Sequence, residues 1–273
     1  MIIDGHRHIL GGHEDILRNM DALGIDKTVL VGVGVRDLGV ITIRDSLIFR
    51  SDFLMRFFGS LKARLLVNSP ALKRVLLENP VNDRVLDAVK AVPDRFLGFA
   101  FINPDSKDAL DELRRCLDTG MRGVKLALVQ FSTDLSGPSM AAICETARDR
   151  GVPIFVHQGI TGPSSDLRQV TATFPEVDFI IAHGGAQYYD QAMELATSRS
   201  NIHIDTSSYL VPFSKLARIC KSIGAGKLIF GSDVPVMSRD PSEGLDRVRR
   251  LPVSEDDRAR ILGGNLADLL ELQ

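Results

Sequence analysis

The chain has 273 residues, of which 33 are lysine or arginine and 35 are aspartate or glutamate, giving a formal net charge of -2. Hydrophobic residues make up 44% and charged residues 25%, which is ordinary for a soluble globular protein. A charge this close to neutral argues against a nucleic-acid binder, because no broad positive field would neutralise phosphates. The length suits one or two domains, and an α/β barrel would use all of it as one.

The amino-terminal residues MIIDGHRHIL lack the basic and apolar regions of a secretion signal. No stretch approaches the roughly 20 uninterrupted apolar residues that a membrane span needs. The cysteines Cys116, Cys144 and Cys220 are odd in number and scattered, so we expect buried, reduced thiols in a reducing compartment. Together these features predict a cytoplasmic protein with no transmembrane segment.

Short apolar runs alternate with helix-length amphipathic segments along the chain. Continuous runs such as TVLVGV, PIFV and DFIIA favour parallel strands that are buried on both faces. Eight strands are predicted, over Ile2–Gly5, Thr28–Val33, Phe96–Ile102, Gly123–Ala127, Ile154–His157, Phe179–Ala182, Ile202–Asp205 and Leu228–Gly231.

Helices are predicted between these strands, over Ser106–Asp118, Met140–Arg150, Ser164–Thr173 and Ala186–Arg199, with another near Asn82. Eight βα repeats in a chain of this length favour a closed (β/α)8 TIM barrel, a single domain of class α/β, over an open doubly wound sheet. Gly32 and Gly34 form a lone GxG, which we interpret as a turn and not as a nucleotide-binding loop.

The segment Arg36–Val81 is too long for an ordinary βα loop, whose usual length is roughly 2–6 residues. Within it, four apolar residues recur every four positions and predict an amphipathic helix: Phe53, Phe57, Leu61 and Leu65. Because βα loops lie on the active face of a barrel, this helical insertion is interpreted as a lid over the site. A homodimer contact is the main alternative, and contact with a membrane surface is a weaker one.

The motif Asp4-Gly5-His6-Arg7-His8 is the strongest chemical signal. Two histidines at i and i+2 on an extended chain point the same way, because side chains alternate with a period of two. They follow the first predicted strand, at the end where barrel enzymes carry functional groups. Two adjacent imidazoles are natural ligands for one divalent metal ion.

Other polar residues fall where later strands end: Lys125 in GVKLAL, His157 in VPIFVHQG, His183 in FIIAHGG and Asp233 in KLIFGSDVP. A single histidine at a strand end is usually structural. Several such side chains at the mouth of one barrel are hard to explain as packing, because burial costs free energy unless they are paired or bind metal.

The motifs DGHRH, GVKL, VHQG, AHGG and GSDVP together resemble the amidohydrolase superfamily. More narrowly, they resemble the amidohydrolase-related group that includes aminocarboxymuconate-semialdehyde decarboxylase, as do NDRVLDAVKAVPDRFLGFAFINP and ILGGNLADLL. The resemblance covers nearly the whole chain outside Arg36–Val81. It implies a metal-dependent enzyme on a TIM barrel, and it does not specify the substrate.

The resemblance also assigns roles to residues. His6, His8, His157 and Asp233 match the metal ligands, and Asp233 can also take a proton from water. His183 matches a histidine that orients or deprotonates water in mononuclear members and binds metal in binuclear ones. Lys125 stands where binuclear members carry a carboxylated lysine that bridges two ions. We expect one divalent ion, most simply zinc with manganese or cobalt as alternatives, and two ions as the second reading.

Several residues also have plain structural interpretations. Lys125 can pair with a carboxylate or bind a substrate carboxylate instead. We expect His203 and His13 to be structural or solvated, and Asn265 to cap the last helix. Asp205 either supports a histidine or caps a helix. Arg36 and Arg44 either reach an anionic substrate or remain solvated.

The function predicted from these features is a metal-dependent hydrolase that uses an activated water on a small carbonyl, amide or lactone substrate, with Asp233 and His183 as catalytic residues. The alternative is a nonoxidative decarboxylase of a small aromatic or unsaturated carboxylic acid. A phosphoesterase or nuclease is less favoured because the chain lacks a broad basic groove. A barrel that binds a ligand without turnover is the non-catalytic alternative.

Overall fold

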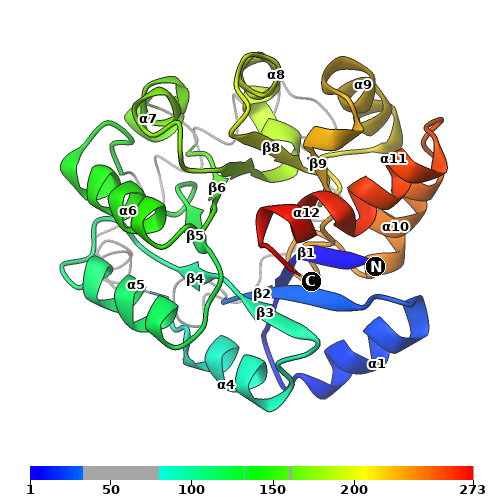
Figure 1. Ribbon diagram of the computed structural model, residues 1–273, viewed down its shortest axis with the longest axis horizontal. Coiled ribbons are helices and arrows are strands. Elements are labelled where there is room, and N and C mark those ends of the chain that lie inside the picture. The colour runs from blue at the N-terminus through cyan, green and yellow to red at the C-terminus, as the bar shows by residue number, and fades with distance from the viewer. Residues whose placement is uncertain (33–79, 132, 160–161, 273) are drawn as a thin grey trace.

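The computed structural model of this chain describes residues 1–32, 80–131, 133–159 and 162–272. Strands lie at the centre and helices form a ring around them (Figure 1). The strands are β1 (Ile3–His8), β2 (Lys27–Val31), β3 (Phe96–Gly98), β4 (Ala100–Phe101), β5 (Val124–Ala127), β6 (Ile154–His157), β7 (Phe179–Ile181), β8 (Ile202–Asp205) and β9 (Leu228–Ile229).

The α-helices follow the strands in alternation, as the sequence predicts. They are α1 (Glu14–Leu23), α4 (Asp83–Ala91), α5 (Ala109–Asp118), α6 (Pro138–Asp149), α7 (Arg168–Thr173), α8 (Tyr189–Ser198), α9 (Phe213–Ile223), α10 (Pro241–Arg249), α11 (Glu255–Ala259) and α12 (Asn265–Leu269). Apart from Pro80 and Val81, the insertion Arg36–Val81 with its predicted helix lies outside the described residues, as do Arg36 and Arg44. None of the described helices is both long and apolar enough to cross a membrane.

The strands are parallel and form a closed ring. One sheet has the order β1-β2-β3 and the other runs from β4 to β9 in chain order. The two sheets meet at Phe99, whose amide donates to the Leu30 carbonyl (3.0 Å), while the Ala100 amide donates to the Gly123 carbonyl (2.8 Å). On the other side, the Gly5 amide donates to the Phe230 carbonyl (2.9 Å). The predicted TIM barrel is therefore confirmed.

The third predicted strand differs from the structure in one respect. The sequence predicts a continuous strand over Phe96–Ile102, whereas the chain forms β3 and β4 with a break at Phe99. The break coincides with a change of partner, because the chain bonds to β2 before it and to β5 after it. An uninterrupted apolar run cannot reveal such a change, since both halves are equally buried.

Helix α5 shows how the apolar spacing sets the outer layer. Leu113, Cys116 and Leu117 lie three and four positions apart, so they share one face and are buried against the barrel. The helix begins at Ala109, later than predicted, because Ser106 first closes a turn on the Asn103 carbonyl (3.0 Å). Cys116, Cys144 and Cys220 are all free thiols and buried, as expected.

The barrel interior is apolar at the amino-terminal ends of its strands. Val29, Phe155 and Ile229 are buried in one cluster with Leu266 and Leu270. The last two belong to α12 and the turn after it, and α12 lies across the ring (Figure 1). Burying such a side chain contributes about 1.5–3 kcal/mol. This end is thereby plugged, and the functional side chains lie at the carboxyl ends of the strands.

Candidate metal centre

The first strand brings two imidazoles to the carboxyl end of the barrel. His6 is 1% exposed and His8 is 9% exposed. The His8 Nδ1 atom lies 2.7 Å from the Gly32 carbonyl oxygen, which can only accept a hydrogen bond. The proton of neutral His8 is therefore on Nδ1, and its Nε2 lone pair faces the Asp233 Oδ1 atom at 3.3 Å. The Nε2 atom of His6 lies 3.8 Å from the same oxygen.

Asp233 is held in the turn that follows β9. Its φ of 56° is in the left-handed region, which costs roughly 1–3 kcal/mol and needs support from the surrounding structure. The support includes a hydrogen bond from the Asp233 amide to the His6 carbonyl (2.6 Å). Asp4 fixes the preceding residue, since its carboxylate accepts hydrogen bonds from the Ser232 amide (2.8 Å) and hydroxyl (2.6 Å).

The Asp233 carboxylate is the chemically decisive group. It is 1% exposed, and neither carboxylate oxygen has a hydrogen-bond partner among the described residues. A buried carboxylate without partners is costly unless a cation compensates it. Imidazole nitrogens of His6, His8 and His183 surround its oxygens at 3.3–3.8 Å. This donor set and the two free oxygens fit a divalent metal ion.

Two further histidines stand at the ends of β6 and β7. His157 is the last residue of β6, and His183 follows β7. His183 begins a turn with a φ of 55°, and its amide donates to the Asp205 Oδ2 atom (3.0 Å). Its Nε2 atom lies 3.6 Å from the Asp233 Oδ2 atom. The His157 ring packs edge-on against the His183 ring with centroids 4.6 Å apart. The histidines predicted from three separate strand ends therefore lie together.

Lys125 lies inside the same cluster. Its Nζ atom is 3.1 Å from the His6 Nε2 atom and 4.0 Å from the centre of the Phe155 ring. Burial lowers the pKa of Lys125 to about 8, although the charges of Asp233 and Asp205 oppose the shift. The contacts of its amine among the described residues are thus an imidazole and an aromatic ring, and its predicted roles, as a bridging ligand or as the partner of a carboxylate, stay predictions.

Burial also keeps three histidines neutral. It lowers the pKa of His157 to about 3, assisted by the charges of Lys125 and His8. The pKa values of His6 and His183 are likewise well below the usual value, chiefly through burial. Neutral imidazoles retain the lone pair that a metal ion needs.

Asp205 supports histidines, and it does not cap a helix. Helix α9 begins only at Phe213, with Pro212 at its cap position. The Asp205 Oδ2 atom accepts hydrogen bonds from the His183 amide and from the Ser207 hydroxyl (2.5 Å). Burial raises the pKa of Asp205 to about 7, against the effect of these hydrogen bonds.

Two overlapping sets of side chains have the spacing of a metal site: His6, His183 and Asp205, and His6, His8 and Asp233. In the first set, the Asp205 oxygens are occupied by hydrogen bonds and face Nδ1 atoms. In the second set, the Asp233 oxygens have no hydrogen bond and face Nε2 atoms. The second set is therefore the better cation site.

Three other predicted residues lie elsewhere. His203 contacts the Asp178 carboxylate (3.2 Å), and the His13 ring packs edge-on against Phe96 with centroids 6.0 Å apart. The helix-cap prediction for Asn265 is wrong, because Asn265 is the first residue inside α12. Its side-chain Nδ2 atom donates instead to the Ala225 (2.8 Å) and Leu228 (2.7 Å) carbonyl oxygens.

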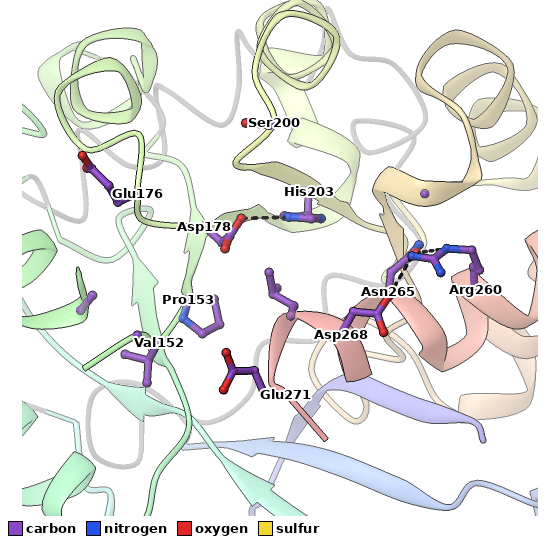
Figure 2. A pocket seen from close by; sticks show the side chains of 14 residues that line it. Val152, Pro153, Glu176, Asp178, Ser200, His203, Arg260, Asn265, Asp268 and Glu271 are labelled. Carbon is purple, nitrogen blue, oxygen red and sulfur yellow. Dashed lines mark hydrogen bonds and ion pairs between the residues drawn. The ribbon is translucent and has the colours of Figure 1, made fainter. Parts of the chain in front are cut away.

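A separate groove lies at the opposite end of the barrel (Figure 2). Its lining includes Pro153, Asp178 and Ser200, each of which precedes a strand, together with Asp268 and Glu271. The groove has a volume of about 480 Å³. It contains none of the histidines discussed above except His203, so it is distinct from the candidate metal centre.

Comparison with known proteins agrees with this geometry. The family model described as amidohydrolase matches residues 62–272. The chain belongs to the amidohydrolase family. None of the curated proteins compared with this amidohydrolase matches it significantly. The family depends on divalent metal ions, and the cluster at the carboxyl ends of the strands has suitable ligands.

Solved structures show the same fold over the whole length. They include 2,6-dihydroxybenzoate decarboxylase from Rhizobium, with 19% identity, a TM-score of 0.66 and coverage of 99% of this chain and 98% of that chain. A probable 2-pyrone-4,6-dicarboxylic acid hydrolase from Acinetobacter baumannii has 18% identity, a TM-score of 0.67 and 99% coverage of both chains. A dihydroxybenzoic acid decarboxylase from Polaromonas, with bound manganese, has 17% identity, a TM-score of 0.64 and coverage of 99% and 97%.

Two contributions to this amidohydrolase site are missed by the sequence analysis. One is Ser207, whose hydroxyl contacts His6 and His183. The other is the pair of Asp4 and Ser232, which fixes the turn before Asp233. Ser207 lies two residues after a strand end, which is the only signal that could have drawn attention to it.

Proposed function

We propose that this amidohydrolase is a metal-dependent hydrolase that acts on a small carbonyl, amide or lactone substrate. The proposal rests on the buried Asp233 carboxylate, whose two oxygens face imidazole nitrogens and have no hydrogen bond within the part of the chain that the structure describes. A divalent ion in this place would explain why a fold tolerates such a carboxylate. The proposed ligands are His6, His8, His157 and Asp233.

The ligand chemistry favours one zinc ion, because three imidazoles and one carboxylate form a nitrogen-rich set. When bound, a divalent ion supplies a Lewis acid that lowers the pKa of water from about 15.7 towards about 7. The Lys125 amine lies 3.1 Å from the His6 Nε2 atom and so contacts a proposed ligand of this single ion.

Asp233 and His183 are the proposed proton carriers. The Asp233 Oδ2 atom accepts no hydrogen bond from any described residue, and it lies 3.6 Å from the His183 Nε2 atom. A proton taken from an attacking water by Asp233 can therefore pass to a leaving group, with His183 orienting the water. The neutral state of His183, which burial favours, leaves its Nε2 atom free to accept a hydrogen bond.

A nonoxidative decarboxylase is the second candidate, because three of the similar solved structures are named as decarboxylases of aromatic acids. The same fold also occurs in a named hydrolase, so the fold does not separate the two reactions. In a decarboxylase, the proton carried by Asp233 or His183 would go to the carbon that loses carbon dioxide.

The experiment uses the full chain, stripped with a chelator and reloaded with Zn²⁺ or Mn²⁺. Lactones, small amides and aromatic carboxylic acids are supplied, and ring opening, amide cleavage and released carbon dioxide are measured separately. Hydrolysis that needs the metal and is lost in Asp233→Asn supports the proposal, and carbon dioxide release supports the alternative. His203→Gln is the matched control, since His203 pairs with Asp178 at the other end of the barrel. Equal activity with and without metal contradicts both.

A further inference from the structure

The Ser207 hydroxyl lies between two imidazoles and a carboxylate. Its Oγ atom is 3.2 Å from the His6 Nδ1 atom, 3.0 Å from the His183 Nδ1 atom and 2.5 Å from the Asp205 Oδ2 atom. All four residues are at most 1% exposed. One hydroxyl therefore joins residues from β1, from the turn after β7 and from the end of β8.

The protons in this network can be counted. The Asp205 oxygens accept hydrogen bonds from the His183 amide (3.0 Å) and the Ser207 amide (3.2 Å). The single hydroxyl proton of Ser207 is donated to Asp205. A hydroxyl has one proton and two lone pairs. Once the proton is used in a hydrogen bond, the oxygen can only accept further hydrogen bonds. When Asp205 is ionised, both histidines therefore donate to Ser207 from Nδ1.

A proton on Nδ1 determines the state of the other ring nitrogen, Nε2, in each histidine. A neutral imidazole with its proton on Nδ1 has a lone pair on Nε2. The Nε2 atoms of His6 and His183 lie 3.8 Å and 3.6 Å from Asp233 oxygens. With the proton on Nε2 instead, His6 would donate towards Asp233 and could not bind a cation, and His183 could not accept a hydrogen bond from water. The positions of these two protons thus decide whether the rings can serve in the proposed site.

We propose that Ser207, held by Asp205, is a positioning residue that sets the tautomers of His6 and His183. It makes the proposed ligand His6 and the proposed water-orienting residue His183 both turn an Nε2 lone pair towards Asp233. At His6 the Lys125 amine, 3.1 Å from Nε2, favours the same tautomer. His8 reaches the same state separately, through the Gly32 carbonyl. The inference rests on the proposed function in one respect, namely that a metal ion uses these lone pairs.

The packing around Ser207 leaves the hydrogen-bonded side chains little room to move. A Cβ atom on Gly231 would lie 2.5 Å from the Asp205 Oδ1 atom, 2.9 Å from the His6 Cβ atom and 3.3 Å from the Ser207 Cβ atom. The absence of a side chain at Gly231 therefore lets the strand carrying His6 approach the network closely. Loss of the hydroxyl would leave two Nδ1 atoms without their shared acceptor.

The test compares Ser207→Ala with a matched control, Thr206→Val. Thr206 is the neighbouring residue, is 2% exposed, and has a hydroxyl with no hydrogen-bond partner among the described residues. Two quantities are measured on the full chain. Histidine tautomers in the metal-free protein are read from long-range ¹H–¹⁵N spectra, and Zn²⁺ affinity is read by competition with a chromophoric chelator.

For the wild type we expect the spectra to show His6 and His183 protonated on Nδ1. In Ser207→Ala at least one ring should shift to Nε2 protonation, and Zn²⁺ affinity should fall by about 10–100-fold, as when other residues that orient metal ligands are lost. Thr206→Val should match the wild type in both measurements. Ser207→Thr, which keeps the hydroxyl, should retain the wild-type tautomers.

Unchanged tautomers in Ser207→Ala, or Zn²⁺ affinity within about twofold of the wild type, would overturn the inference. Should Ser207→Ala not fold, Ser207→Cys replaces it, because a thiol is only a weak donor and a weak acceptor. Tautomers that stay unchanged in Ser207→Cys would also overturn it. If the wild type binds no Zn²⁺, the proposed function fails, while the metal-free spectra still decide the role of Ser207.

Discussion

Replacing Asp233 with asparagine is expected to affect the metal-free and the metal-loaded protein differently. In the metal-free protein, Asp233 is 1% exposed, and neither carboxylate oxygen has a hydrogen bond to a residue that the structure describes. Burying such a charge costs several kcal/mol, so removing the charge with little change of shape should not lower stability. The metal-free variant should therefore melt at or above the wild-type temperature.

The metal-loaded protein should respond in the opposite sense. An ion present at about 1,000 times its Kd stabilises the fold by about 4.1 kcal/mol. With an unfolding entropy of about 2.1 cal/mol/K per residue, this raises the Tm of a chain of this length by about 7 °C. If the variant binds about 100-fold more weakly, the stabilisation is about 1.4 kcal/mol and the rise is about 2.5 °C.

Thermal unfolding with and without added Zn²⁺ measures both effects. Asp178→Asn is the control, because Asp178 pairs with His203 at the opposite end of the barrel and should keep the full metal-induced shift. A metal-free Asp233→Asn protein that melts several degrees lower, with an unchanged shift on adding Zn²⁺, would refute the reasoning.

Three further predictions follow from the same cluster. First, the metal-free protein should lose stability from pH 7 to pH 5, because burial holds the pKa of three histidines below 6.5 in the folded state only. Each contributes up to about 1.4 kcal/mol per pH unit. Asp205, whose folded pKa is raised to about 7, acts in the opposite sense. Urea unfolding should therefore show a net loss of about 3–4 kcal/mol between pH 7 and pH 5; stability independent of pH would contradict this. Second, Gly231→Ala should destabilise the fold by about 1–3 kcal/mol, since its Cβ would press on the Asp205 carboxylate; chemical denaturation equal to that of the wild type would show that the strand can move. Third, Lys125→Met should still bind one Zn²⁺ per chain by elemental analysis, whereas a fall from two ions to one would indicate a bridging lysine.

The architecture and the main histidines were predictable because local patterns determine them. Continuous apolar runs mark strands buried on both faces, and in a parallel barrel their carboxyl ends meet. His6, His157 and His183 stand at the ends of such runs, so the sequence indicates their convergence. Asp233 follows the last run in the same way.

The remaining features depend on contacts between distant segments. The left-handed backbone at His183 and Asp233 is supported by hydrogen bonds to Asp205 and His6, which no local pattern shows. Ser207 gains its role only when β1 and the turn after β7 flank it. Asn265 resembles a helix cap in sequence. In the structure its side-chain amide donates to the Ala225 and Leu228 carbonyls instead.

We propose that side chains from distant strand ends share one cation beside Asp233. Anomalous diffraction at the zinc absorption edge, from crystals of Zn²⁺-loaded protein, locates such an ion without reference to activity. We expect one strong peak per chain within bonding distance of His6, His8, His157 and Asp233. No peak there, or a peak only in the groove beside His203, would contradict it.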